Sequence, residues 1–401
     1  MIAHKNSHKY LLVPALIAAL LFPATASAAP KLVTVKAAAK WAESTDVELF
    51  TVTAESVITV KNVLSNTSNI EIQARDFTGV NLWSKTIDSG SDEVATAIAA
   101  DSQGNIWLAG NSAAATSAET ATATGSALNP DNVIIDYVTP LRQDMRQLTL
   151  WKVSKAGEVT ETLATLQNEI SIIDAISISP TGISAIGSRE SGPFLISTNI
   201  KGEFSKELKF GTAKTKLNSV VRLGDGSVNL FGSSTETLSG KKLVGREDGV
   251  LIKVSKSGAI SSVVRSSAPR ALRSWTSATS TLFLTGSVKS GTTIQSAITK
   301  FTSSFAPTWT TRIASTGATW AANGPNKSFY VALEPTAAIK GLAPIKLIKG
   351  QSFVLQFDSK GLLVGAFSAA EMSAAKAIAY SAVGGLFLLT ETGIFRVGGA
   401  R

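Results

Sequence analysis

The sequence has 401 residues, with 38 lysines and arginines against 29 aspartates and glutamates, two histidines and no cysteine. Without cysteine the chain cannot form disulfides or thiolate metal sites, and both histidines, His4 and His8, precede the segment that we expect to remain after processing. The mature chain would then lack the base of Ser-His-Asp and Cys-His catalytic systems, and we expect neither a metal nor a cofactor. No stretch combines dense basic residues with stacking aromatics, which argues against nucleic acid as a ligand.

The first 28 residues are typical of a secretory signal. Lys5 and Lys9 provide a positive start, residues 11–24 form an apolar stretch, and Ala26-Ser27-Ala28 is a small-residue cleavage site. The apolar stretch contains two prolines and is shorter than the roughly 20 residues of a membrane-spanning helix, so an uncleaved anchor is only the alternative. We therefore predict a signal peptide over 1–28, cleavage near Ala28, secretion to the cell surface or outside the cell, and a single domain over 29–401.

A short apolar strand that ends on glycine recurs along the chain. Its clear copies are IWLAG at 106–110, ISAIG at 183–187, VNLFG at 228–232 and LFLTG at 282–286, and its looser copies are at 57–61, 329–333 and 386–390. Self-similarity at intervals of roughly 40 to 50 residues in an all-strand chain indicates a β-propeller. A stacked β-solenoid is the alternative fold.

Each copy is predicted to be the second of four strands in a blade. An Ala- and Ser-rich strand precedes it through a polar turn such as DSQGN at 101–105, and small side chains suit the innermost strand. A second hairpin follows it, for example VLIKVSKSG at 250–258 with alternating polar and apolar residues. We name the four strands a to d from the axis outward. Six blades then begin near Asp46, Glu93, Ser171, Thr215, Ala271 and Thr319.

The last repeat has only three strands, at 374–381, 386–390 and 394–398. The missing outer strand is available as KLVTVKAAA at 31–39, directly after the expected signal. Pairing the two chain ends removes open sheet edges. The sequence therefore predicts an all-β, seven-bladed β-propeller of four-stranded blades, whose ring is closed by the N-terminal strand completing the last blade.

Three long insertions, at 112–147, 235–248 and 336–350, all connect strand b to strand c. The b–c and d–a connections of a blade leave from the same end, so we expect all three insertions on one face. Loops on a rigid scaffold are where binding residues concentrate. The candidate ligand or partner rim consists of Asp136, Tyr137, Arg142, Arg146, Lys242, Arg246, Asp248, Arg270, Arg273, Trp275 and Lys346. The basic members would suit a carboxylate, a phosphate or an acidic glycan, and the alternative is an ordinary solvated set of loops.

Residues 92–112, DEVATAIAADSQGNIWLAGNS, resemble the bacterial SBBP and NHL-type β-propeller repeats. The match is carried by Asp101, Gly104, Asn105, Trp107 and Gly110. The resemblance implies a bacterial propeller and says little about function. The His-dependent chemistry of lyases on related propellers cannot be transferred, because the expected mature chain has no histidine.

The leading functional hypothesis is a non-catalytic binding or scaffold module, monomeric, whose partner is a protein or an anionic cell-surface polymer. Peripheral membrane contact through the basic loops is a further hypothesis. The alternative from another class is a carboxylate-based, glycan-directed hydrolase or lyase at the channel mouth, which requires two carboxylates within about 5 to 10 Å of each other. Turn acids such as Asp101, Asp225 and Asp358 stand one to a turn, and isolated acids of this kind do not form a calcium loop.

Overall fold

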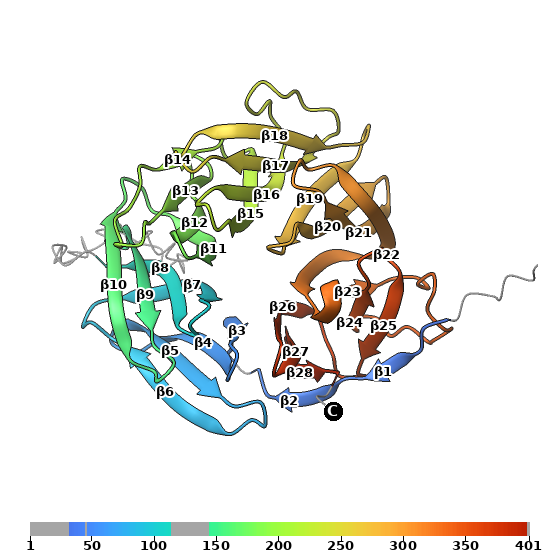
Figure 1. Cartoon of the computed structure of the whole chain (residues 1–401), viewed down its shortest axis with the longest axis horizontal. Coiled ribbons are helices and arrows are strands. Elements are labelled where there is room, and N and C mark those ends of the chain that lie inside the picture. Colours follow the sequence, from blue (N-terminus) through green and yellow to red (C-terminus); the bar gives the residue numbers. More distant parts are fainter. Residues whose placement is uncertain (1–31, 45, 114–143, 399–401) are drawn as a thin grey trace, which may run out of the picture. The chain divides into compact units, whose positions relative to one another are not determined.

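In the computed structural model, β-sheets are arranged around a central opening (Figure 1). The structure describes residues 32–44, 46–113 and 144–398. These residues form 28 strands and one three-residue 3-10 helix, η1 (Pro325–Lys327). In the described part no helix is both long enough and apolar enough to cross a membrane. The predicted signal peptide lies outside the described residues and stays a prediction.

Five of the sheets contain four strands each. The first is formed by β3 (Leu49–Val52), β4 (Val57–Leu64), β5 (Ser68–Arg75) and β6 (Asn81–Ile87). The second is formed by β7 (Glu93–Ala100), β8 (Ile106–Ser112), β9 (Gln147–Val153) and β10 (Val159–Leu166). The third is formed by β11 (Ile172–Ser179), β12 (Gly182–Ser188), β13 (Phe194–Ser197) and β14 (Leu208–Lys209). The fourth is formed by β15 (Thr215–Arg222), β16 (Val228–Ser234), β17 (Asp248–Val254) and β18 (Ile260–Ser266). In these four sheets consecutive strands pair antiparallel from the inside outward, as the repeat predicts.

One sheet contains eight strands, where the sequence predicts two separate blades of four. Seven of its strands are consecutive: β19 (Leu272–Ala278), β20 (Phe283–Ser290), β21 (Thr293–Phe301), β22 (Pro307–Asn323), β23 (Phe329–Pro335), β24 (Phe353–Phe357) and β25 (Leu363–Ser368). The eighth is the N-terminal strand β1 (Val35–Ala37). The two halves merge because β22 is continuous over 17 residues. Its first part pairs with β21, and its last part pairs with β23. The expectation of seven separate sheets is therefore wrong in this region.

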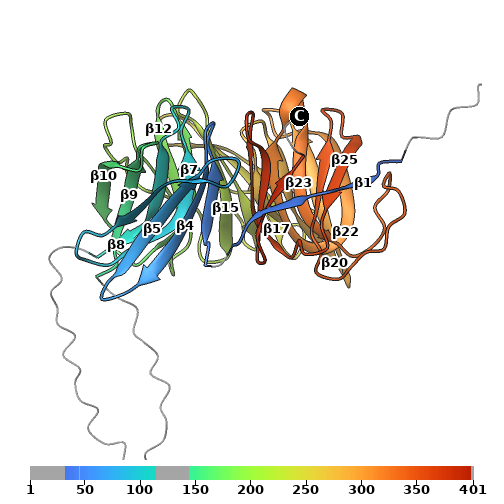
Figure 2. The same cartoon turned by 90° about the horizontal axis from the view of Figure 1, so that it is seen from below.

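The two ends of the described chain meet in the fifth four-stranded sheet. It is formed by β26 (Ala375–Ser381), β27 (Gly385–Thr390), β28 (Ile394–Val397) and, at the outside, the N-terminal strand β2 (Ala39–Ala42). The sequence predicts this outer strand at 31–39, which is too early. The segment β1 (Val35–Ala37) instead pairs parallel with β25 of the neighbouring sheet, as Figure 2 shows.

The glycine that ends the clear copies of the b strand has a backbone cause. In the second sheet Gly110 lies opposite Ala95, where the inner strand β7 bulges by one residue. A Cβ atom on Gly110 would lie 1.9 Å from the carbonyl oxygen of Val94, and Gly232 and Gly286 face an inner-strand carbonyl oxygen at the same distance. Only glycine fits this place, so the recurring residue marks a bulge in the innermost strand.

The bulged residues connect one inner strand to the next around the opening. Thr96 Oγ1 donates a hydrogen bond to the Ile173 carbonyl oxygen at 2.7 Å, and Asn218 Nδ2 donates to that of Trp275 at 2.8 Å. Asp174 occupies the equivalent bulge of β11. Its ionised carboxylate has no proton to donate, so it cannot form the same connection.

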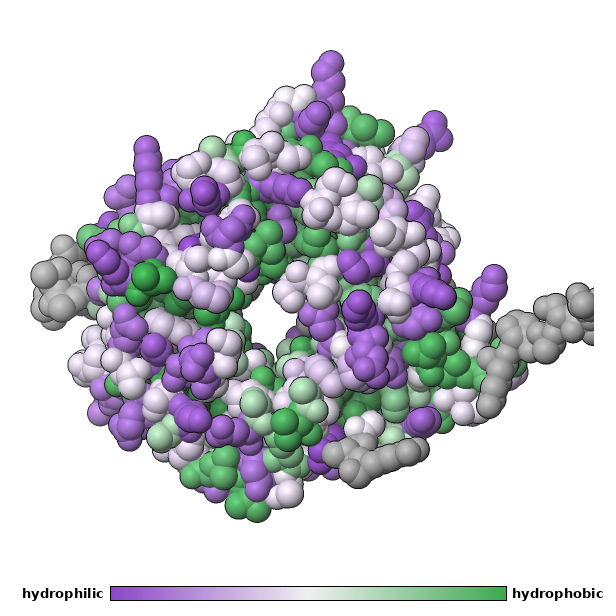
Figure 3. Space-filling view, viewed as in Figure 1, coloured by the Kyte–Doolittle hydropathy of each residue, from purple (hydrophilic) through white to green (hydrophobic). Residues whose placement is uncertain are grey.

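Apolar side chains pack between neighbouring sheets. One core cluster joins Ile186 and Leu195 of the third sheet to Leu230 and Val250 of the fourth, all nearly inaccessible. Burying one such side chain fully contributes about 1.5–3 kcal/mol. The centre of the ring remains open in the space-filling view (Figure 3). The scaffold is therefore a set of packed sheets around an open channel, with connections at its two faces (Figure 2).

Candidate functional site

The face that carries the b–c and d–a connections is the predicted functional face. Two of its insertions, 235–247 after β16 and 336–352 after β23, connect b strands to c strands as expected. Most of the first insertion, with Asp136, Tyr137 and Arg142, lies outside the described residues.

Four loops of this face, 210–214, 235–247, 267–271 and 336–352, form what we call the basic arc. Their exposed cations are Lys214, Lys241, Lys242, Arg246, Arg270, Lys340, Lys346 and Lys349. The same loops contain only two acids, Glu236 and Glu247. Within the part of the chain that the structure describes, none of these eight cations forms an ion pair. Their positive charge therefore faces solvent, although Lys214 lies close enough to Glu236 to help lower the pKa of that carboxyl.

The opposite stretch of the same face, which we call the acidic arc, consists of the loops 369–374, 391–393, 43–48, 65–67 and 88–92. Its acids are Glu371, Glu391, Glu43, Asp46, Glu48, Asp88 and Asp92. These five loops contain no lysine or arginine. The two arcs of this face therefore carry opposite charge, while the loops 167–171 and 189–193 of the third sheet, which lie on the same face, carry both signs.

Main-chain hydrogen bonds join the second insertion to the start of β19. The Arg246 N–H donates to the Ala271 carbonyl oxygen at 2.9 Å, and the Arg273 N–H donates to that of Glu247 at 3.0 Å. The structure therefore brings Arg246 together with Arg270 and Arg273, which the sequence places more than 20 residues away. We call these three residues the arginine cluster.

Asp248 does not belong to an exposed rim, contrary to the sequence prediction. Its side chain is 0% exposed, and its carboxylate accepts hydrogen bonds from the Val244 and Gly245 N–H groups, both at 2.9 Å. It also pairs with Arg265 at 3.3 Å. Burial alone would raise the pKa of Asp248, but these donors outweigh it and hold the pKa below its ordinary value. Asp248 therefore anchors the end of the insertion.

Trp275 is also wrongly predicted as a rim residue. It is 3% exposed, and its ring packs edge-to-face against Phe301 with centroids 5.5 Å apart. The remaining described candidates, Lys242, Lys346 and Arg146, lie on the predicted face but outside the arginine cluster.

Arg273 is the half-buried member of the arginine cluster. Its Nη1 donates to the Ser267 carbonyl oxygen at 3.3 Å. Burial lowers the pKa of Arg273, nearby Arg312 lowers it further, and Asp248 opposes the shift. A bound anion would favour the charged guanidinium. Arg312 was missed from the sequence because it lies inside β22 rather than in a loop.

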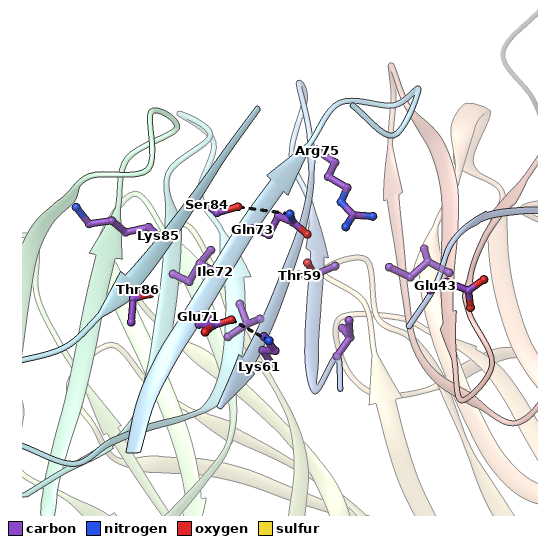
Figure 4. Close-up of a pocket in the computed structure, with 13 residues that line it drawn as sticks. Glu43, Thr59, Lys61, Glu71, Ile72, Gln73, Arg75, Ser84, Lys85 and Thr86 are labelled. Atoms are coloured by element: carbon purple, nitrogen blue, oxygen red, sulfur yellow. Dashed lines mark hydrogen bonds and ion pairs between the residues drawn. The ribbon is translucent and has the colours of Figure 1, made fainter. Parts of the chain in front are cut away.

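A cavity also lies between the first sheet and the sheet completed by β2. Figure 4 shows this groove of about 640 Å³, with Arg75 on one side and Glu43 on the other. Inside it Lys61 Nζ pairs with Glu71 Oε2 at 2.9 Å, and the hydrogen bond to Glu71 raises the pKa of Lys61. Cations and acids are mixed here, so the groove lacks the charge bias of the basic arc.

Carboxylates gather at one point of the acidic arc. Burial raises the pKa of Glu93, and the neighbouring Asp88 and Asp92 raise it further. Glu93 is only 1% exposed, so its carboxyl group is not accessible to a substrate. Among the described residues no group of three or more His, Cys, Asp or Glu side chains could hold a metal ion.

The repeated sheets around an open channel define a β-propeller. A streptogramin B lyase structure is similar to the chain with a TM-score of 0.51 at 9% identity, covering 89% of this chain and 96% of the lyase. The WD40 domain of coronin from Toxoplasma gondii is similar with a TM-score of 0.52 at 12% identity, covering 92% of this chain and 89% of that domain. No protein-family model matches the sequence, and no curated protein matches it. At such low identity the two structures show the fold alone.

Proposed function

We propose that the chain is a secreted, non-catalytic, seven-bladed propeller of the bacterial SBBP/NHL type that binds an anionic cell-surface polymer through the basic arc. The count of seven treats the eight-stranded sheet as two blades that share β22. The pairing of β2 with β28 supports closure of the ring by the N-terminal strand.

The observation that carries this proposal is the separation of charge on one face. Eight exposed cations without ion pairs in the described part, spread over four loops of one face, create a positive potential that attracts and orients an anionic chain. The arginine cluster adds planar donors suited to carboxylate or phosphate oxygens. Because the cations face solvent, binding should weaken strongly between about 0.05 and 0.5 M salt.

The test reverses four charges of the basic arc in the secreted protein. The variant carries Lys242→Glu, Arg246→Glu, Arg270→Glu and Lys346→Glu. At about 0.5–1 kcal/mol per lost charge contact, affinity for immobilised polygalacturonate should fall roughly 30- to 1,000-fold. The matched control makes the same change of net charge on the opposite face, in the exposed residues Lys201, Lys206, Lys256 and Lys360.

Equal weakening by both variants would show that only net charge matters and would overturn the proposal. Binding to anionic lipid vesicles without binding to soluble anionic polymers would assign the arc to a membrane surface instead. Turnover of a glycan by the purified protein would contradict the non-catalytic part.

A further inference from the structure

A pocket of about 400 Å³ opens beside the arginine cluster, between β19, β20 and an irregular part of β22. Its walls present the hydroxyl-bearing residues Ser274, Thr276, Ser287 and Thr316, together with Lys289. None of these five residues is part of the rim predicted from the sequence. Arg273, a member of the arginine cluster, and Glu247 also line it. The pocket therefore combines several hydroxyl groups with two cations and one acid.

The irregularity of β22 explains why a pocket forms here. Ser315 pairs with Pro335 and Thr319 with Leu333, so three residues of β22 lie opposite a single residue of β23. In the middle Gly317 adopts a φ of 101°, and a Cβ atom there would lie 3.1 Å from Ile294. An irregularity of this kind bends a strand locally, and Thr316, Gly317 and Ala318 of this part of β22 line the pocket.

Several polar groups of the pocket are available to a ligand. Lys289 and Thr316 are exposed, and Ser287 is half-buried. Lys289 forms no ion pair within the described part of the chain. In contrast, the Thr276 hydroxyl already contacts the Thr319 hydroxyl at 3.1 Å. Lys289, Ser287 and Thr316 are therefore the groups that we expect to contact a ligand.

We infer that this pocket binds one sugar unit of the anionic polymer, so that the preferred ligand is an acidic polysaccharide. The inference rests on the proposed function of the basic arc. Serine and threonine hydroxyls both donate and accept, which matches the hydroxyl groups of a sugar ring, and Lys289 suits its acidic substituent. A volume of about 400 Å³ falls within the range of small-ligand pockets and accommodates a monosaccharide.

The test compares two polymers that carry one carboxylate per unit, polygalacturonate with a sugar ring and polyglutamate without one. Several hydrogen bonds of ordinary strength should make polygalacturonate bind about five- to fiftyfold more tightly to the wild-type protein. The double variant Ser287→Ala, Thr316→Val should lose most of this preference, while its affinity for polyglutamate stays unchanged. The control Ser257→Ala, Thr160→Val removes the same two hydroxyl types from exposed positions elsewhere.

Two results separate this inference from the proposed function. If the fourfold charge reversal weakens both polymers but the pocket variant weakens neither, the sugar pocket is wrong and the basic arc stands. If the charge reversal weakens neither polymer, the basic arc itself is wrong. Equal wild-type affinity for the two polymers would also overturn the sugar pocket.

Discussion

The basic arc and the acidic arc lie on the same face and are built on the same repeating scaffold, yet they carry opposite charge. The strands beneath both arcs repeat the pattern of an inner strand followed by an apolar b strand. The charged residues that distinguish the arcs stand mostly in the connecting loops. The repeat therefore determines where a surface can form, whereas the loops determine the charge that this surface presents to a partner.

Next to each arc, near the start of an inner strand, lies one residue whose charged form is disfavoured by burial and by like charge. Next to the acidic arc Glu93 has a raised pKa beside Asp88 and Asp92. Beside the basic arc Arg273 has a lowered pKa next to Arg312. Like charges are thus crowded on both sides of the face, which is the condition under which an oppositely charged partner binds favourably.

The largest effect is expected from the residue that holds the basic arc in place. Asp248→Ala leaves Arg265 buried without its partner and two main-chain N–H groups without an acceptor. Removing one partner of a buried ion pair lowers the free energy of unfolding by about 3–5 kcal/mol, which chemical denaturation measures. Because the pKa of Asp248 is lowered by folding, its contribution is present at neutral pH and is lost as the pH falls through the acidic range. Asp225→Ala, in an exposed turn of the opposite face, is the control, and an equal loss there would contradict the anchoring role.

A smaller effect is expected from extending the basic arc across the acidic one. Replacing Asp46, Glu371 and Glu391 by lysine removes repulsion and adds attraction for an anionic chain. Affinity for polygalacturonate should rise roughly tenfold at low salt, since exposed charges contribute about 0.2–1 kcal/mol each. The matched control replaces three exposed acids of the opposite face, Glu55, Glu158 and Glu203. A gain of the same size in the control would mean that the position of the charges is irrelevant.

The repeat allowed the b strands to be located, and in its clear copies the terminal glycine has a local backbone cause. The merging of two blades could not be predicted, since the polar segment around Gly317 looks like an ordinary turn. The outer strand of the last sheet was placed too early because Ala37, Ala38 and Ala39 give no turn signal between β1 and β2. Sequence alone cannot choose the register of such a segment.

Only part of the candidate site was predicted, because the rest depends on strand pairing between residues that are distant in the sequence. Arg246, Arg270 and Arg273 follow from placing two loops on one face. The burial of Asp248 depends on Arg265, which approaches only after β17 and β18 have paired, and no local pattern reveals this. Arg312 and Lys289 lie in strands, where a charged residue is normally assigned to a solvated side. The site residues predicted from the sequence therefore differ from those in the structure where long-range strand pairing decides the position of a side chain.

The smallest effect concerns Asp174, the bulge residue of β11. Desolvation by surrounding atoms raises the pKa of Asp174 from 3.8 to about 6. Its proton is therefore bound more tightly in the folded state than in the unfolded state. The stabilisation is fully present below about pH 4 and is lost as the pH rises through 6. Asp174→Asn should therefore raise the unfolding free energy at pH 8 and change it little at pH 4, since an amide can donate like Asn218 at its own bulge.

We expect a gain of about 1 kcal/mol or less at pH 8, because the Asp174 side chain keeps access to water and solvent screening reduces the effect of burial. Denaturant titrations of both proteins at pH 4, 6 and 8 measure it. Asp358→Asn, in a turn of the opposite face, is the matched control substitution. A constant difference between the Asp174→Asn variant and the wild-type protein across the three pH values would show that the amide acts through packing, and that the carboxyl of Asp174 does not titrate as the bulge geometry implies.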